Sequence, residues 1–316
     1  MHITLRQLLV FQTVAEHLSV SRAAESLFLS QPAVSMQLKK LTESVGMPLI
    51  EQVGKQLYLT PAGTVLYKSS REISETLERL EMAIDDMQGL KKGRLRLAVV
   101  TTIEYFAPRV LGAFCERFPG IEVELEVTNR KRLLERLAAN RDDLYILGKP
   151  PEGIEVEAHP FMPNPLVVMA PRNHPLAGER HIPLDRLLEE PFIMREPGSG
   201  TRKAAERLFS AHQLSPKVRL ELGSNEAIKQ AVAGGLGVAI LSRHTLSLEG
   251  DEGPLTILDV EGFPLERQWY LVYPKGKQLS VAAQSFFDHL VAIAPAASVR
   301  NSTGNEEANF KGVFDG

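Results

Sequence analysis

The chain has 316 residues, of which 44% are hydrophobic and 24% are charged. At about 100 to 200 residues per domain, this length predicts two or three domains. The composition is typical of a soluble globular protein rather than a fibrous or disordered one. The formal net charge is −3, from 36 basic and 39 acidic side chains. This near-neutral charge alone indicates neither a nucleic-acid binder nor a strongly charged partner.

Several kinds of site and location are excluded by what the sequence lacks. Cys115 is the one cysteine, so no internal disulfide is expected, and no apolar run approaches the roughly 20 residues of a membrane span. Without a secretory signal, we expect a cytoplasmic protein that does not contact membranes. The eight histidines lack the spacing of metal ligands, and no catalytic nucleophile motif occurs. The sequence therefore predicts no metal site, no cofactor and no enzymatic activity.

Three short blocks of apolar residues at helical spacing occupy residues 5–45 and predict three helices. Only the turn at 28–30 separates the second helix from the third, which is too short for antiparallel packing and is typical of a helix-turn-helix. Ser30 can cap the third helix, and Pro32 suits its first turn. Residues 49–59 carry β-prone residues beside a Gly-Lys break, so we expect a hairpin wing there.

The third helix predicts a DNA-binding face. Its residues off the apolar stripe include glutamine and serine, which can read base edges, and lysines, which can bind phosphates. The alternative is an ordinary solvated helix face. Residues 1–60 hold five basic and four acidic side chains, so tight binding to double-stranded DNA requires two or more linked modules. The candidate DNA-binding residues are Ser30, Gln31, Pro32, Ser35, Lys39 and Lys55.

A long helix is predicted after the wing, with Thr60 as its N-cap and Pro61 at its first position. Along it, apolar residues recur at intervals of 7, 4, 3, 4 and 3, the spacing of a coiled-coil seam. We expect residues 61–92 to form a dimerisation helix; the alternative is a helix packed on its own domain. The seam residues are Leu66, Ile73, Leu77, Leu80, Ile84 and Met87.

From residue 93 onward, short apolar strands alternate with amphipathic helices, which predicts an α/β fold with parallel sheets. Asn, Ser, Gly and Glu dominate residues 294–316, so a disordered tail is predicted there. The predicted strands are 95–100, 121–127, 144–147, 166–170, 192–195, 218–222, 238–241 and 269–273, and the predicted helices are 104–118, 130–139, 201–212, 225–233 and 279–293.

The ends of the predicted strands supply candidates for a ligand site, because ligands in open α/β sheets bind beyond the carboxyl ends of the strands. This rule selects polar residues that directly follow the first three strands of the α/β region. They are Thr101, Thr102, Thr128, Asn129 and Lys149.

The loop at residues 195–202, Arg-Glu-Pro-Gly-Ser-Gly-Thr-Arg, is the most informative stretch of this region. It places two arginines around a Gly-rich turn where a helix begins. Backbone N–H groups, hydroxyls and guanidinium groups together suit a phosphate or a carboxylate. The alternative is an ordinary capped loop with exposed arginines. The loop adds Arg195, Ser199, Thr201 and Arg202 to the candidate ligand-binding residues.

Four strings in the first 63 residues resemble the LysR-type transcriptional regulators. The most specific is Ser-Gln-Pro-Ala-Val-Ser at 30–35. The resemblance covers about residues 1–293 and implies that Gln31, Pro32, Ser35 and Lys39 line the recognition helix. The strings are Leu-Arg-Gln-Leu-Leu-Val-Phe at 5–11, Ser-Arg-Ala-Ala-Glu-Ser-Leu at 21–27, Leu-Ser-Gln-Pro-Ala-Val-Ser at 29–35 and Leu-Thr-Pro-Ala-Gly at 59–63.

The resemblance also implies a fold and partners. The family's effector domain is similar to type 2 periplasmic binding proteins, so residues 93–293 are expected to form two lobes around a ligand cleft. The strand pattern places lobe I at 93–161 plus 268–293, and lobe II at 162–267.

Implied partners are promoter DNA, RNA polymerase and further copies of the chain, as a dimer or a tetramer. Where the family commonly has Leu-Phe-Glu-Arg, this chain has Leu-Ile-Glu-Gln at 49–52, which leaves Lys55 as the main cation of the wing.

Within the family, the loop at 195–202 and three further strings resemble the CbbR branch, whose members regulate Calvin-cycle carbon-fixation operons. This implies an activator that responds to a phosphorylated sugar such as ribulose bisphosphate, to phosphoenolpyruvate or to NADPH. Asn225, in the string at 223–232, joins the candidate effector residues. Lys149 stands where the branch commonly has arginine, which keeps the charge but loses a bidentate fork. Alternatives are regulation of another metabolic operon, or a dimeric solute-binding or enzymatic α/β protein. The other strings are at 143–151 and 241–244.

Overall fold

The computed structural model of this chain describes residues 2–54, 56–87, 92–247 and 253–299. The chain divides into two compact units, Met1–Gln88 and Gly89–Gly316. Each unit is built around its own buried apolar clusters. The finer domain boundaries expected at residues 60, 92, 161, 267 and 293 stay a prediction.

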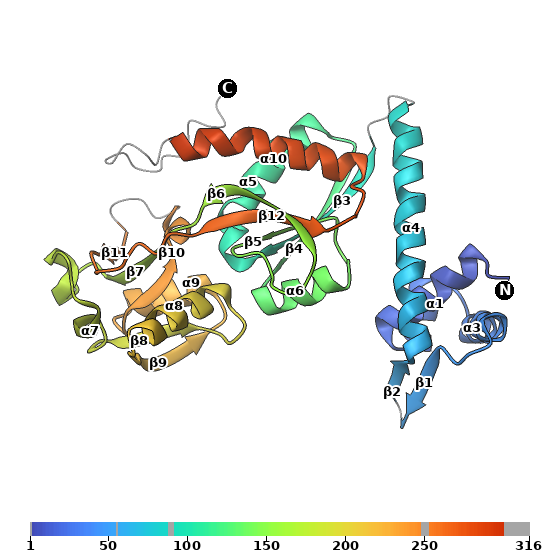
Figure 1. Cartoon of the computed structure of the whole chain (residues 1–316), viewed down its shortest axis with the longest axis horizontal. Coiled ribbons are helices and arrows are strands. Elements are labelled where there is room, and N and C mark those ends of the chain that lie inside the picture. Colours follow the sequence, from blue (N-terminus) through green and yellow to red (C-terminus); the bar gives the residue numbers. More distant parts are fainter. Residues whose placement is uncertain (1, 55, 88–91, 248–252, 300–316) are drawn as a thin grey trace. The chain divides into compact units, whose positions relative to one another are not determined.

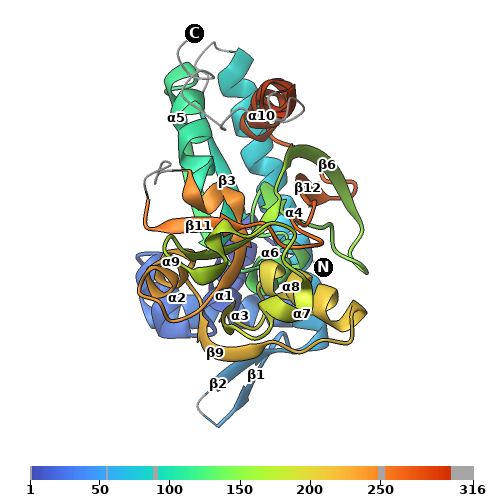
Figure 2. The ribbon, with the colours of Figure 1, turned by 90° about the vertical axis from the view of Figure 1, so that its left-hand side faces the viewer.

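The first unit contains the predicted helix-turn-helix and wing. A three-residue core of Phe11, Leu41 and Leu49, each at most 1% exposed, joins the first helix, the third helix and the start of the hairpin. The hairpin projects from the three helices (Figure 2). The elements are α1 (Leu5–His17), α2 (Val20–Ser26), α3 (Gln31–Val45), β1 (Ile50–Val53), β2 (Gln56–Leu59) and α4 (Pro61–Met87).

Local sequence signals set the ends of these helices. Thr4 forms a capping box with Gln7 at the start of α1, and the Ser30 side chain accepts a hydrogen bond from the Ala33 N–H at the start of α3. Such caps satisfy N–H groups that have no partner within the helix. Gly63 is required by packing, since a Cβ there would lie 1.9 Å from the Leu49 carbonyl oxygen.

Helix α4 is one continuous helix of 27 residues that begins after Thr60, whose hydroxyl accepts a hydrogen bond from the Gly63 N–H at 3.0 Å. Of the predicted seam, Leu66 packs on the core of its own unit. Four later seam residues instead expose between 38% and 55% of their surface to solvent within one chain: Ile73, Leu77, Leu80 and Ile84. The seam therefore packs on its own unit at the start of α4, and its later residues are exposed to solvent. The side chain of Met87 lies outside the described residues.

The second unit contains a five-stranded sheet in the order β4-β3-β5-β12-β6. Successive side chains of β3 point to opposite faces of the sheet. One face packs on α5 and α10, and the other packs on α6. Figure 1 shows α10 and α6 on opposite faces of this sheet. The elements are β3 (Gly93–Val100), η1 (Thr101–Tyr105), α5 (Ala107–Arg117), β4 (Ile121–Thr128), α6 (Arg130–Ala138), β5 (Leu144–Leu147), β6 (Val156–Pro163), β12 (Gln268–Pro274) and α10 (Val281–Val299).

A second group of strands makes the other lobe of this unit. Strands β10, β7 and β11 pair in that order, and β8 pairs with β9. Helices α7 and α8 pack on one side of these strands, and α9 packs on the other. The elements are β7 (Leu166–Pro171), η2 (Pro175–Gly178), α7 (Leu184–Leu187), β8 (Pro191–Arg195), α8 (Gly200–Ala211), β9 (Lys217–Leu222), α9 (Asn225–Ala233), β10 (Ala239–Ser242), η3 (Arg243–Leu246) and β11 (Leu255–Leu258).

The prediction of parallel sheets is wrong in part. Strands β3, β4 and β5 are parallel, as are β8 and β9. Strand β12 is antiparallel to both β5 and β6, and β7 is antiparallel to β10 and β11. A helical crossover is what makes neighbouring strands parallel. Here the chain passes between the lobes after β6 and again before β12. Strand β12 is therefore not joined to its neighbours β5 and β6 by a helical crossover, and it runs antiparallel to both.

The two crossovers run beside each other, since the Asn164 N–H donates to the Arg267 carbonyl oxygen at 2.7 Å and the Leu166 N–H donates to Leu265 at 3.0 Å. Strands β6 and β11 have no counterpart in the sequence prediction. Helix α10 ends at Val299, so residues 294–299, the start of the predicted tail, are helical. Residues 300–316 lie outside the described part of the chain. Within that described part, no helix is long and apolar enough to cross a membrane.

Candidate functional site

Helix α3 presents a polar face whose residues are close together in the sequence. Gln31, Pro32, Ser35 and Lys39 are exposed, whereas Val34 and Leu41 of the same helix are fully buried. Ser30 caps the helix at the edge of this face. The structure therefore brings five of the six predicted DNA-binding residues onto one surface. The sixth, Lys55, lies outside the described residues.

Two contacts modify this face. The Gln31 Nε2 donates to Ser21 Oγ of helix α2 at 2.6 Å, so the glutamine amide is oriented by a residue that the sequence prediction did not include. Lys39 Nζ lies 4.0 Å from Glu43 Oε1, with both side chains more than 60% exposed. A pair this exposed is screened by water and salt, and the lysine stays able to contact a phosphate.

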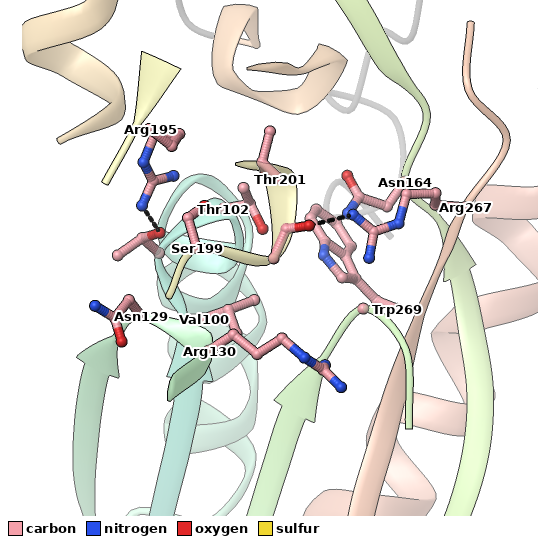
Figure 3. Close-up of a pocket in the computed structure, with 13 residues that line it drawn as sticks. Val100, Thr102, Asn129, Arg130, Asn164, Arg195, Ser199, Thr201, Arg267 and Trp269 are labelled. Carbon is pink, nitrogen blue, oxygen red and sulfur yellow. Dashed lines mark hydrogen bonds between the residues drawn. The ribbon is translucent and has the colours of Figure 1, made fainter. Parts of the chain in front are cut away.

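The second unit contains a cavity where its two lobes meet. It holds about 370 Å³ of empty space, part of which is open to solvent. Its walls come from the ends of β3, β4 and β5, from the N-terminus of α8, and from the two crossovers. Figure 3 shows these residues around the space. They are Val100, Thr101, Thr102, Asn129, Arg130, Gly148, Asn164, Arg195, Ser199, Gly200, Thr201, Arg267 and Trp269.

Six predicted effector residues line this cavity: Thr101, Thr102, Asn129, Arg195, Ser199 and Thr201. Ser199 caps α8, because its side chain accepts from the Arg202 N–H. The first N–H groups of a helix have no partner within it and favour anions. The residues selected at the strand ends and those of the Gly-rich loop therefore line the same cavity, although the two groups are far apart in the sequence.

Four predicted effector residues are not among those that line the cavity. Thr128 is buried at the end of β4. Lys149 is paired with Glu152 at 2.8 Å. Asn225, fully buried, accepts a hydrogen bond from Arg195.

Arg202 is the fourth of these residues, and its guanidinium is occupied elsewhere. It lies 2.7 Å from Glu206 and 2.9 Å from Glu221, and it donates to the Arg195 carbonyl oxygen at 3.0 Å. The glutamates, first of all Glu206, raise the pKa of Arg202. Arg202 therefore stabilises the loop and the helix that carry the cavity wall.

Three residues of the cavity wall were missed by the sequence prediction and carry unsatisfied polar groups or charge. Among the described residues, Trp269 Nε1 and one terminal nitrogen of Arg130 are buried without a hydrogen-bond partner. Burial lowers the pKa of Arg130, and Arg207 lowers it further, whereas Glu152 raises it. Burial, Arg130 and Arg207 all lower the pKa of Arg267. Both guanidinium groups stay protonated, so the cavity contains two poorly neutralised positive charges.

Arg267 reaches the cavity from the second crossover, where its Nη1 donates to the Gly200 carbonyl oxygen at 3.1 Å. A Cβ at Gly148 would lie 2.8 Å from Arg267 Nη2, so the glycine leaves room for the guanidinium. Arg130 directly follows Asn129, and adjacency to that strand end could have identified it. No local signal marks Arg267 or Trp269, since only the return of the chain through the crossover places them here.

Comparison with known proteins identifies both units. Residues 5–64 match the family described as bacterial regulatory helix-turn-helix protein, lysR family, and residues 88–294 match the LysR substrate binding domain. The chain is 54% identical over 296 residues to the HTH-type transcriptional activator CmpR of Synechocystis sp., covering 94% of this chain and 97% of that protein. It is 52% identical over 291 residues to the RuBisCO operon transcriptional regulator of Acidithiobacillus ferrooxidans, covering 92% and 94%.

A solved structure, the regulatory domain of Synechocystis PCC6803 CcmR in complex with 2-PG, shares 56% sequence identity with this chain. It has a TM-score of 0.63 and covers 64% of this chain and 98% of that one. The helix-turn-helix, the long helix and the mixed α/β domain confirm the fold class predicted from the sequence. The chain belongs to the LysR-type transcriptional regulators, is closely related to regulators of RuBisCO operons, and is not an enzyme.

Proposed function

We propose that this regulator activates a carbon-fixation operon when a small anionic metabolite occupies the cavity of its second unit. The observation that carries the proposal is the pair of poorly neutralised arginines, Arg130 and Arg267, in the cavity wall. Two findings support it from outside the chain: a relative at 52% identity is a RuBisCO operon regulator, and a domain at 56% identity was solved with 2-PG.

The cavity offers an anion several donors of different kinds. Arg130 and Arg267 can each present a planar fork to a phosphate or carboxylate. The N-terminus of α8 presents backbone N–H groups beside Thr201, and Trp269 Nε1 has no other partner among the described residues. The sequence-predicted candidates in this set are Thr101, Thr102, Asn129, Ser199 and Thr201.

The donors of the cavity favour a ligand that carries a phosphate or a carboxylate group. A phosphorylated acid such as 2-phosphoglycolate or phosphoenolpyruvate, and a small sugar phosphate, carry such groups.

The DNA-binding surface in this proposal is the exposed face of α3, with Ser30, Gln31, Pro32, Ser35 and Lys39. An α-helix fits the major groove, where glutamine and serine can read base edges. The small number of cations predicts weak binding by one module, so affinity depends on joining modules.

The exposed apolar residues of α4 supply a way to join them. Ile73, Leu77, Leu80 and Ile84 follow one another at coiled-coil intervals, and each is at least 38% exposed. Pairing of α4 with a second copy would remove this apolar surface from water. Effector binding between the lobes would then change the spacing of the DNA-binding modules and, through it, the recruitment of RNA polymerase.

Footprinting of the purified full-length chain on its upstream promoter region tests the proposal. We expect protection of a dyad, and a change in the protected region when 2-phosphoglycolate is added. Ser35→Ala and Lys39→Ala should each weaken DNA binding about tenfold or more, whereas Lys68→Ala, an exposed lysine on α4, serves as the matched control. Absence of binding to any dyad-containing fragment at low salt would contradict the regulatory function.

A further inference from the structure

One wall of the cavity is held by buried hydrogen bonds that connect the two lobes of the second unit. Arg195, at the end of β8, donates from Nη2 to Thr101 Oγ1 at 2.9 Å and from Nη1 to Asn225 Oδ1 at 2.6 Å. Asn225 Nδ2 lies 3.2 Å from the Thr101 carbonyl oxygen and 3.2 Å from Glu104 Oε1, and donates to both. Arg195 and Asn225 are 2% and 0% exposed. Segment η1 is therefore fixed by residues of the opposite lobe. Figure 3 shows Arg195 reaching across to this segment.

The charge of Arg195 is already matched within the protein. Its Nε lies 2.8 Å from Glu196 Oε2 and its Nη2 lies 3.1 Å from Glu196 Oε1. Each guanidinium nitrogen thus has a protein acceptor. This differs from Arg130, which keeps a buried nitrogen without a partner among the described residues. Although Arg195 lines the cavity, its nitrogens are already engaged by Glu196, Asn225 and Thr101.

The bond from Arg195 determines what the Thr101 hydroxyl can do. A hydroxyl group has one hydrogen to donate and two lone pairs that accept. Because an arginine side chain has no acceptor, the Thr101 oxygen must accept from Arg195, and its own hydrogen is left for another group. Thr101 also lines the cavity, so that hydrogen is available to an acceptor there. Donation from a charged group polarises the hydroxyl and strengthens the bond that it donates.

We propose that Arg195 is a positioning residue: together with Asn225 it fixes Thr101 so that the Thr101 hydroxyl donates to an anionic oxygen of the ligand. This inference rests on the proposed function, in which the cavity binds a small anion. The arrangement favours ligands that present an acceptor oxygen at this point, because the one hydrogen of the Thr101 hydroxyl is free to donate to it. It also connects the ligand, through Thr101 and Arg195, to both lobes at once.

A double-mutant cycle on the full-length chain tests this role, with 2-phosphoglycolate as the ligand and calorimetry as the readout. In the wild-type background, Thr101→Val should weaken binding about tenfold, since it removes one hydrogen bond to a charged group, whereas Thr101→Ser should keep affinity within about twofold. In an Arg195→Lys background, Thr101→Val should cost less than about twofold, because lysine lacks the planar fork that reaches Thr101 and Asn225 together. Arg219→Lys, at an exposed arginine of β9, is the control.

Two results would overturn the inference: the same loss from Thr101→Val in both backgrounds, or a loss from Thr101→Ser as large as that from Thr101→Val. The second comparison needs no Arg195 variant, so the role assigned to the Thr101 hydroxyl can be overturned even if Arg195→Lys does not fold.

Hydrogen exchange of the ligand-free protein adds a test that does not depend on the effector. Arg195→Lys should speed exchange at residues 101–105 about tenfold relative to Arg219→Lys, because the segment loses its hold on the opposite lobe. Unchanged exchange would contradict the positioning role. If the wild type binds neither 2-phosphoglycolate nor inorganic phosphate, the proposed function fails, while the exchange rates still decide whether Arg195 positions Thr101.

Discussion

The exposed polar face of α3 is contained in a single helix of 15 residues, whereas the cavity wall is drawn from positions between Val100 and Trp269. The helix face needs only a cap, an apolar stripe and 3.6-residue periodicity, all of which are local. The cavity needs strand ends, a helix N-terminus and two crossovers to meet. A surface formed by one helix, such as the α3 face, can therefore be identified from the sequence. A site assembled from distant segments, such as the cavity, is identified only in part.

The two regions also use charge differently. Lys39 on α3 is exposed and lies near a glutamate, so its interactions are weakened by water and salt. Arg130 and Arg267 are partly buried, and burial lowers the pKa of each guanidinium group. A charge in a less polar environment interacts more strongly with an opposite charge. In the proposed function, the α3 face therefore depends on several copies of the chain, and the cavity depends on a few partly buried cations.

The largest effect is expected at α4, because in the proposed function the weakly charged face of α3 binds DNA through joined modules. Leu77→Glu combined with Leu80→Glu should dissociate the oligomer and lower DNA affinity about 10²- to 10⁴-fold through loss of effective concentration. Sedimentation and fluorescence anisotropy on a promoter fragment measure the two effects. Lys68→Glu makes the same change of net charge at an exposed position on the side of α4 away from the seam and should leave assembly intact. An intact oligomer in the double variant would show that copies join through another surface.

The next effect concerns the buried charge of the cavity. Arg267→Gln keeps hydrogen-bonding capacity but removes the cation, and it should weaken 2-phosphoglycolate binding about tenfold and reduce its dependence on salt. Calorimetry at two or more salt concentrations measures both quantities. Arg186→Gln, at an exposed arginine paired with Glu179, controls for the change of net charge. Equal binding by the Arg267 variant and the wild type would remove this arginine from the effector site.

The smallest effect is expected at Arg202, which the sequence placed beside Arg195 as an equivalent effector residue. Its guanidinium is engaged by Glu206, Glu221 and the Arg195 carbonyl oxygen. Arg202→Ala should change 2-phosphoglycolate affinity less than about twofold while lowering the thermal midpoint of unfolding. Calorimetry and differential scanning fluorimetry separate the two outcomes. A loss of affinity as large as that of Arg267→Gln would return Arg202 to the ligand-binding residues.

Features that depend on short-range interactions could be predicted from the sequence. Ser30 and Thr60 cap the helices that they were predicted to cap, and polar residues after β3 and β4 do line the cavity. Contacts between residues that are far apart in the sequence could not be predicted in this way. Arg195 and Thr101 are 94 positions apart, and the strand-end rule gives no information on whether such a pair binds a ligand or each other.

The sequence by itself determined the helix-turn-helix, the wing, the long helix with its apolar seam and the alternation of strands and helices, because caps and periodicity act over a few residues. Only the tertiary structure decided that β12 returns antiparallel, that this return brings Arg267 and Trp269 into the cavity, and that Arg195 and Arg202 are already paired. The first two outcomes depend on how the chain crosses between the lobes, and the third depends on which charges find partners in the folded chain. An arginine reads the same in sequence whether a glutamate or a ligand neutralises it.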